Sequence, residues 1–166
     1  MYFRKILIIV LLLAPVNLPA QGEALRWYSF NEGMILAQKQ GRPVLIDFYA
    51  DWCHWCKVME SQTFKAPEVA KYLKKHYVCI RIDTEAKKKN ITYQGRRFSG
   101  GQFFSFMGGS GLPTLIFIDS KGDLVTRIPG FIPRENFLPL IRYINDRCYE
   151  KMISYDDYVN GRKSCP

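Results

Sequence analysis

Two cysteines separated by two residues form the part of this 166-residue chain that is best suited to chemistry, Cys53-His54-Trp55-Cys56. If a helix begins at Cys53, this spacing brings both sulfurs to one edge of its first turn. There the helix dipole and the free backbone N–H groups stabilise a thiolate, which is the form of cysteine that attacks disulfides. We therefore predict that Cys53 is the nucleophile and that Cys56, one turn further along, resolves the mixed disulfide.

Other roles for this cysteine pair fit the sequence less well. A zinc site needs two more ligands, but Cys79 lies within an apolar run and His76 has no partner at metal-binding spacing. A c-type haem needs His directly after the second cysteine, where this chain has Lys57. A purely structural disulfide over so short a loop stabilises little. We therefore expect no metal and no cofactor other than the redox-active disulfide Cys53–Cys56.

The elements that must position the pair alternate between apolar strands and amphipathic helices. Asn31 is the expected N-cap of the first helix, which Gly41 and Pro43 end. We expect helices at about 31–40, 53–64, 67–73, 102–107, 133–144 and 149–160, strands at 44–49, 77–83, 114–119 and 124–128, and a polar loop at 84–100. This order predicts an α/β fold with one mixed sheet and helices on both of its faces.

The first residues are typical of a secretory signal. Arg4 and Lys5 precede the apolar run Ile6–Ala14, and the small residue Ala20 precedes Gln21. An uncleaved membrane anchor is the alternative, but the run is shorter than the ~20 residues of a spanning helix. The sequence thus predicts a cleaved signal peptide at 1–20 and a periplasmic or otherwise exported protein, with Ala24 as a second candidate cleavage position.

The chain is basic, with a formal net charge of +9, or +7 once Arg4 and Lys5 are removed with the leader. The excess includes the run Lys87–Lys89 together with Arg96 and Arg97. Nucleic acid is one conceivable partner for a basic chain, but no nucleic-acid motif is present and we expect none to bind. A solvated basic surface, able to steer acidic partners or to lie near anionic lipid, is the expectation.

Around the cysteines, the run Asp47–Lys57 resembles the active-site segment of the thioredoxin superfamily, and the later Gly111-Leu112-Pro113-Thr114 matches a second motif of that superfamily. Residues beyond Cys56, including Met59-Glu60 and Pro67-Glu68-Val69, are similar to the C-terminal domain of the thiol–disulfide interchange protein DsbD and to SoxW-type thioredoxins. The resemblance covers roughly residues 25 to 147. It implies a thioredoxin fold at 21–147, followed by a short helical C-terminal extension at 148–166 that packs on the domain.

The resemblance also implies roles for single residues. Pro113 corresponds to a cis-proline whose loop, with Leu112, faces the cysteines and pairs with substrate backbone. Asp47 corresponds to a buried acid that takes a proton from Cys56 through water. Trp52 corresponds to a residue that shields the disulfide, although simple packing is the alternative. Lys57 either pairs with Asp47 or is solvated.

The dipeptide between the cysteines departs from the Gly-Pro of thioredoxin. A protonated His54 beside Cys53 favours the thiolate and makes a site more oxidising, whereas a His54 that points into solvent does not. Trp55 either offers an apolar face to substrate segments or only covers the helix start. The direction of electron flow therefore stays open at this point.

The chain has five cysteines, and three of them lie outside the motif. Cys79 lies in an apolar strand and is expected to be buried and inert. Cys148 and Cys165 lie beyond the expected thioredoxin core, and a structural disulfide between them would tie the extension to the last main helix. The alternatives are a third redox thiol or a link between molecules.

These features predict a periplasmic protein thiol–disulfide oxidoreductase that reduces or exchanges disulfides in exported proteins. It needs an electron donor or acceptor, because the chain has no Gly-rich dinucleotide fingerprint; a membrane thiol–disulfide transporter is a candidate. We expect a monomer. The alternative is a binding module or chaperone-like protein on a thioredoxin scaffold with non-catalytic thiols.

Overall fold

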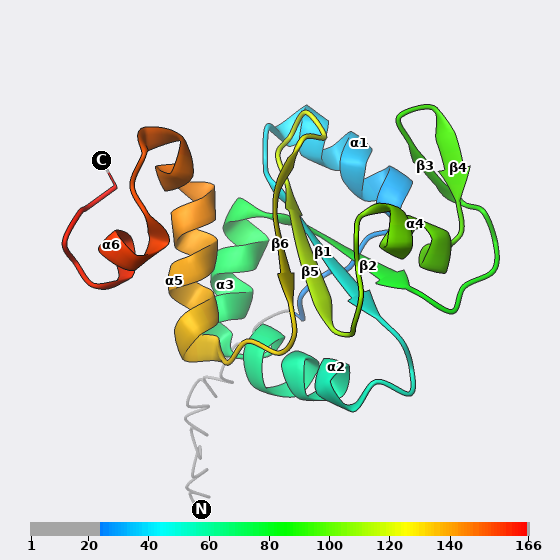
Figure 1. Ribbon diagram of the computed structural model, residues 1–166, viewed down its shortest axis with the longest axis horizontal. Helices are drawn as coiled ribbons and strands as arrows, with labels where there is room; N and C mark the ends of the chain where they lie inside the picture. Colours follow the sequence, from blue (N-terminus) through cyan, green and yellow to red (C-terminus); the bar gives the residue numbers. More distant parts are fainter. Residues whose placement is uncertain (1–23, 166) are drawn as a thin grey trace, which may run out of the picture.

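A four-stranded mixed sheet with the strand order β2-β1-β5-β6 forms the centre of the computed structural model, which describes residues 24–165 (Figure 1). Its elements are α1 (Phe30–Gln40), β1 (Val44–Tyr49), α2 (His54–Met59), the π-helical turn η1 (Glu60–Phe64), α3 (Pro67–His76), β2 (Val78–Asp83), β3 (Ile91–Tyr93), β4 (Arg96–Phe98), α4 (Gly100–Phe106), β5 (Thr114–Ile118), β6 (Leu124–Pro129), α5 (Arg134–Asn145), the 3₁₀ turn η2 (Cys148–Lys151) and α6 (Tyr155–Val159). The predicted leader at 1–20 lies outside the described residues. None of the described helices is long and apolar enough to cross a membrane.

Strand β1 lies in the middle of the sheet, as its nearly continuous apolar sequence predicts. It pairs in parallel with β2, so that Asp47 lies opposite Arg81, and it pairs antiparallel with β5, so that Asp47 also lies opposite Leu115. Strand β6 adds antiparallel to β5 at the sheet edge. The predicted α/β fold with one mixed sheet is therefore confirmed.

The side chains of β1 alternate between two apolar cores, one on each face of the sheet. Ile46 and Phe48 belong to the core under α1 and α4, where Phe103 is fully buried. Leu45 belongs to the opposite core, which α3 and α5 cover with Leu73 and other apolar side chains. Because Asp47 has the same parity as Leu45, its carboxyl group lies on the second face, where α2 also packs.

The predicted N-cap at Asn31 is wrong, because α1 begins at Phe30 and its N-cap is Ser29. Phe30 is buried, with its ring edge-on to Phe103 at 4.8 Å between centroids, so the helix starts where this ring enters the core. The Asn31 side chain instead donates to the Asn90 carbonyl at 2.9 Å and accepts from the Thr92 N–H at 3.0 Å.

The predicted polar loop at 84–100 is also wrong, because it contains the β3–β4 hairpin. Ile91 lies opposite Phe98 in this hairpin, and both are buried in the core under α1 and α4. Two apolar residues that face the same core are enough to fold back a segment that is otherwise polar. Two expected helices also differ in detail, since 53–64 ends as a π-helical turn and 149–160 divides into η2 and α6.

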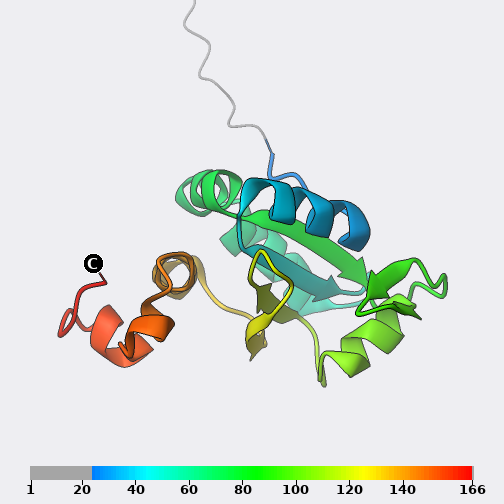
Figure 2. The same ribbon diagram turned by 90° about the horizontal axis from the view of Figure 1, so that it is seen from above.

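The C-terminal extension packs against α5, mainly through aromatic rings. Tyr143 on α5 donates a hydrogen bond to the Ile153 carbonyl at 2.8 Å, and its ring lies 5.3 Å from Tyr155 and 5.5 Å from Tyr158. Figures 1 and 2 show this extension and the β3–β4 hairpin at opposite ends of the molecule.

Candidate active site

The Cys53–Cys56 pair is joined in a disulfide at the start of α2, near the point where β5 begins (Figure 1). Cys53 is the N-cap of this helix, and its Sγ accepts a hydrogen bond from the Cys56 backbone N–H at 3.1 Å. A sulfur that already accepts an N–H bond at a helix start is well placed to carry negative charge after reduction. Both cysteines are nearly buried, with 3% and 6% of their surface exposed.

Two partly buried side chains, Tyr49 and Leu112, pack against the small cluster formed by Ala50 and the two cysteines. Trp52, which the resemblance implies is a shield for the disulfide, is 69% exposed. Tyr49, from the end of β1, and Leu112, from the loop before β5, are the partly buried side chains that contact the disulfide cluster.

That loop contains the cis peptide bond Leu112–Pro113. The Pro113 carbonyl accepts a hydrogen bond from the Gly130 N–H at 2.8 Å, and the Thr114 hydroxyl donates to the Gly111 carbonyl at 2.6 Å. The first bond ties this loop to the residue that follows β6, and the second ties it to the first residue of β5. Leu112 and Pro113 thus lie where the resemblance predicts.

An apolar hollow of about 240 Å³ adjoins the disulfide, and its walls include Trp55, Leu112 and Pro113. Phe131 completes one wall and stacks on Trp55, with 5.5 Å between centroids and 29° between planes. Trp55 remains 54% exposed, and the exposed His54 ring lies edge-on to it. The hollow therefore offers apolar and aromatic surface beside Leu112, which packs against the two cysteines.

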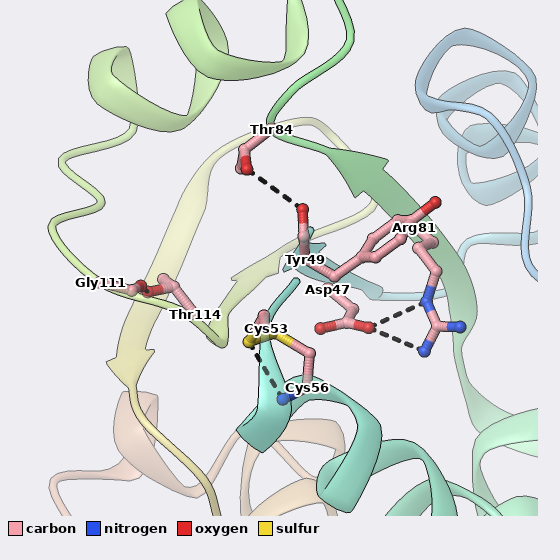
Figure 3. The surroundings of a disulfide bond; sticks show 8 residues. All are labelled: Asp47, Tyr49, Cys53, Cys56, Arg81, Thr84, Gly111 and Thr114. Atoms are coloured by element: carbon pink, nitrogen blue, oxygen red, sulfur yellow. Dashed lines mark hydrogen bonds and ion pairs between the residues drawn. A yellow bond between two sulfur atoms is a disulfide. The ribbon is translucent and has the colours of Figure 1, made fainter. Parts of the chain in front are cut away.

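Behind the disulfide, Asp47 is 2% exposed and forms an ion pair with Arg81. Its Oδ2 accepts from Arg81 Nε at 2.9 Å and lies 2.8 Å from Nη2. Its Oδ1 is buried and has no hydrogen-bond partner among the described residues. Figure 3 shows one carboxyl oxygen directed at Arg81 and the other directed toward the Cys53–Cys56 disulfide.

Burial raises the pKa of Asp47 to about 6 from its ordinary value of 3.8, although the Arg81 charge and hydrogen bond act in the opposite direction. Desolvation therefore outweighs the ion pair. The result is a carboxyl group that binds and releases a proton near neutral pH, with one free oxygen on the side of the cysteines. Those are the properties of a general acid–base group.

Arg81 is the residue of this site that the sequence analysis did not identify. Its Nη2 lies 2.5 Å from Glu60 Oε2 as well as 2.8 Å from Asp47, so one guanidinium bridges both carboxylates. Its position is held by the Trp27 ring, whose centroid is 4.1 Å from Cζ. The signal was available, because Asp47 and Arg81 are charged residues at the fourth positions of two largely apolar strands. Lys57, for which pairing with Asp47 and solvation were the two alternatives, is exposed.

The other three cysteines lie away from this site. Cys79 is a free, buried thiol on β2, and burial raises its pKa to about 12, which leaves it protonated and unreactive. Cys148 is joined to Cys165 in a disulfide that ties the end of the extension to the end of α5. No group of three or more His, Cys, Asp or Glu side chains at 24–165 is arranged to hold a metal ion.

Comparison with known proteins agrees with this arrangement. A family model described as a thioredoxin-like domain matches residues 30–145. The chain belongs to the thioredoxin-like family. It carries both the fold and the paired cysteines of a thioredoxin-like disulfide oxidoreductase.

Curated relatives include the thiol:disulfide interchange protein DsbD of Yersinia pestis, which is 35% identical over 106 residues. These residues are 63% of this chain and 16% of that relative, so the chain spans about a sixth of its length. DsbD of Escherichia coli K12 is 33% identical over 109 residues, which are 64% of this chain and 18% of that relative.

Two solved structures share both fold and sequence with this thioredoxin-like chain. The thioredoxin of Thermus thermophilus is 27% identical with a TM-score of 0.59, over 73% of this chain and 87% of that one. The reduced DsbD C-terminal domain of Neisseria meningitidis is 27% identical with a TM-score of 0.54, over 68% of this chain and 90% of that one. Both align with most of the domain that holds the disulfide.

Proposed function

We propose that this chain is an exported enzyme that reduces or exchanges disulfides in other exported proteins. The observation that carries the proposal is a juxtaposition. On one side the Cys53–Cys56 disulfide adjoins the apolar hollow formed by Trp55 and Phe131, and on the other side it adjoins the free oxygen of Asp47. The hollow suits a side chain next to a substrate cysteine, and the carboxyl group supplies the acid–base chemistry.

In the reducing direction, the Cys53 thiolate attacks one sulfur of a substrate disulfide. This forms a Cys53–substrate disulfide and releases the other substrate sulfur as a thiolate. Asp47 then accepts the Cys56 proton, and the Cys56 thiolate attacks Cys53 Sγ. The second substrate thiolate leaves, and the Cys53–Cys56 disulfide forms. The substrate gains two electrons, which a dithiol donor must return to the enzyme in the next cycle.

The Asp47–Arg81–Glu60 group gives this proposal its proton acceptor. Arg81 occupies only Oδ2 of the carboxyl group, so Oδ1 is left to take the proton. Arg81 also stabilises the ionised carboxylate, whereas burial favours the protonated one. The two effects together keep both protonation states accessible during a catalytic cycle.

The export part of the proposal is supported by the leader-like residues 1–20. The similarity to DsbD supports a membrane thiol–disulfide transporter as the electron donor. N-terminal sequencing of the protein recovered from the periplasm tests the location. A mature chain that begins near Gln21 is expected, and an intact Met1 in the cytoplasm would contradict it.

Reduction of insulin disulfides in the presence of dithiothreitol tests the activity. We expect Cys53→Ala to abolish it and Cys56→Ala to accumulate a mixed disulfide with insulin, because the resolving thiol is absent. Cys79→Ala, which changes a buried free cysteine of β2 outside the redox pair, is the control and should retain activity. Unchanged activity in Cys53→Ala would sink the proposal in favour of a binding module with non-catalytic thiols.

The reduction potential of Cys53–Cys56, measured against glutathione, tests the direction of electron flow. A value near the ~−270 mV of thioredoxin supports a reductant, whereas one near the ~−120 mV of a strong oxidase overturns the reducing direction.

A further inference from the structure

The β3–β4 hairpin and α4 form a basic surface that the disulfide chemistry does not use. A hollow of about 690 Å³ lies between them, and the residues around it are Lys89, Arg96, Arg97, Phe98, Gly101, Gln102, Ser105 and Phe106. None of these residues carries a carboxylate. Lys87 and Lys88 precede it in the chain and add to the same positive charge.

Among the residues that the structure describes, the cations of this surface have no acidic partner. Within residues 24–165, the ion pairs involve other side chains, and Lys89, Arg96 and Arg97 take part in none of them. Arg96 and Arg97 are exposed. Their charge is therefore uncompensated in the isolated chain and available to an anionic partner.

The two arginines are nevertheless held in defined places. The Arg96 guanidinium lies over the Phe98 ring at 5.1 Å and the Phe106 ring at 5.2 Å. Arg97 Nη2 donates to the Lys89 carbonyl at 2.8 Å. A guanidinium fixed in this way keeps other N–H groups free for a carboxylate and loses less side-chain entropy when it binds one.

The platform beneath them is firmly attached to the domain. Ile91 is buried in the core under α1 and α4. The Tyr93 hydroxyl donates to the Gly122 carbonyl at 2.8 Å, and Asn31 bonds the backbone at both Asn90 and Thr92. The hairpin is thus a fixed surface and not a loose basic loop.

We infer that this basic surface docks an acidic segment of a partner protein that carries an apolar or aromatic residue among its carboxylates. Charge complementarity supplies the carboxylates. The Phe106 side chain, 41% exposed at the rim, supplies an apolar contact next to the guanidinium groups.

The position of this surface ties it to the oxidoreductase without making it part of the redox site. After α4 ends at Phe106, the chain runs through the loop at 107–111 to Leu112 and Pro113. A partner held on α4 and the hairpin therefore contacts the element that leads into the loop over the disulfide. The surface adds a second, thiol-independent contact for a protein partner.

Fluorescence anisotropy with a labelled, cysteine-free peptide of several glutamates around one phenylalanine tests the inference. We expect the wild-type chain to bind it more weakly as salt increases. The double variant Arg96→Glu/Arg97→Glu should bind at least roughly tenfold more weakly, since tenfold corresponds to the loss of about one charge-assisted contact. Peptides with Gln for Glu, or Ala for Phe, should also bind more weakly.

The matched control is Lys71→Glu/Lys75→Glu, which changes the net charge equally at two exposed positions of α3. It should retain peptide binding. An equal loss of peptide binding in both double variants would overturn the docking surface. So would peptide binding that is unchanged in Arg96→Glu/Arg97→Glu. So would an unbound peptide together with Arg96-dependent binding to phosphatidylglycerol vesicles, because the partner would then be a membrane.

Insulin reduction provides a separate readout, because neither arginine touches the disulfide. We expect Arg96→Glu/Arg97→Glu to reduce insulin at the wild-type rate, which also shows that the variant is folded. Because peptide binding needs no thiol, failure of the docking inference and failure of the proposed redox function are distinguishable.

Discussion

The two disulfides of this chain differ in what surrounds them and in the length of chain they close. Cys53 and Cys56 are three positions apart, at the start of a helix and with Asp47 behind them. Cys148 and Cys165 are 17 positions apart, and Cys148 is fully buried at the end of α5. Opening a disulfide that closes a short loop costs the folded protein little stability, whereas opening one that closes a longer loop costs it more. The first disulfide is therefore suited to opening and closing, and the second to holding the extension in place.

The largest expected difference between the two disulfides is in activity. Cys53→Ala removes the nucleophile, and we expect insulin reduction to fall to the uncatalysed rate. Cys148→Ser/Cys165→Ser leaves the redox site untouched and should retain most of the activity at a temperature where it is folded. A comparable loss in the double variant would show that the second disulfide also takes part in electron transfer.

For stability, removal of Cys148–Cys165 should have the larger effect and removal of Cys53–Cys56 the smaller one. In the chain-entropy model, a loop of this length contributes about 3 kcal/mol, so Cys148→Ser/Cys165→Ser should lower the free energy of unfolding by about that amount. Urea denaturation under non-reducing conditions measures it. Cys53→Ser/Cys56→Ser should cause a smaller decrease, and a larger decrease in that variant would contradict the division of roles.

The two disulfides also differ in that the buried acid Asp47 lies behind Cys53–Cys56. The folded chain binds the Asp47 proton more tightly than the unfolded chain, with a pKa of about 6 against 3.8. Ionisation of Asp47 therefore costs stability progressively as the pH rises from about 4 to about 6. Arg81 retains Glu60 when Asp47 is replaced, so its charge is not left without a partner.

We accordingly expect Asp47→Asn to be more stable than the wild type at neutral pH by about 3 kcal/mol, since one pKa unit corresponds to about 1.4 kcal/mol. The gain should disappear below about pH 4, where both states of the wild type hold the proton. Its insulin reduction should be slower and should lose the wild-type increase through pH 6. Urea denaturation and rate profiles across pH check both, and a variant that is less stable at pH 7 would refute this account of Asp47.

The smallest expected effect concerns the hollow beside the first disulfide. Trp55→Ala removes the stack with Phe131, an aromatic contact of about 1 kcal/mol, and should raise the KM for insulin roughly fivefold. The rate with a small disulfide reagent should not change. Ile35→Ala, at an exposed apolar position on α1, is the control. An equal effect of both variants on KM would remove the hollow from substrate binding.

The parts of the fold that the sequence predicts well are those with a strong periodic signal. The apolar runs of β1, β2 and β5 and the helical spacing of Phe137, Ile141 and Ile144 all lie where expected. The β3–β4 hairpin was not predicted, because Ile91, Tyr93 and Phe98 are its only side chains that pack on the core under α1 and α4, and the residues around them are largely polar or charged. Strands of three residues are too short to show a clear periodicity.

The cysteines were predictable from spacing alone, whereas their surroundings depended on strand register. The ion pair between Asp47 and Arg81 exists because β1 and β2 align in parallel from Val44 and Val78 onward. The sequence left open whether Lys57 pairs with Asp47 or is solvated, and Lys57 lies on the exposed side of α2. Leu112, which packs against both cysteines, is likewise remote from them in sequence.

The buried thiol of Cys79 gives this chain an internal reporter of its own core. The side chain is 2% exposed, and its raised pKa keeps it protonated. A thiol reagent therefore modifies Cys79 only in molecules whose second apolar core has opened. The rate of that modification measures how often the sheet separates from α3 and α5. Cys79 lies on the same face of the sheet as Asp47. The same modification rate therefore also reports how often Asp47, the acid behind the redox disulfide, becomes exposed.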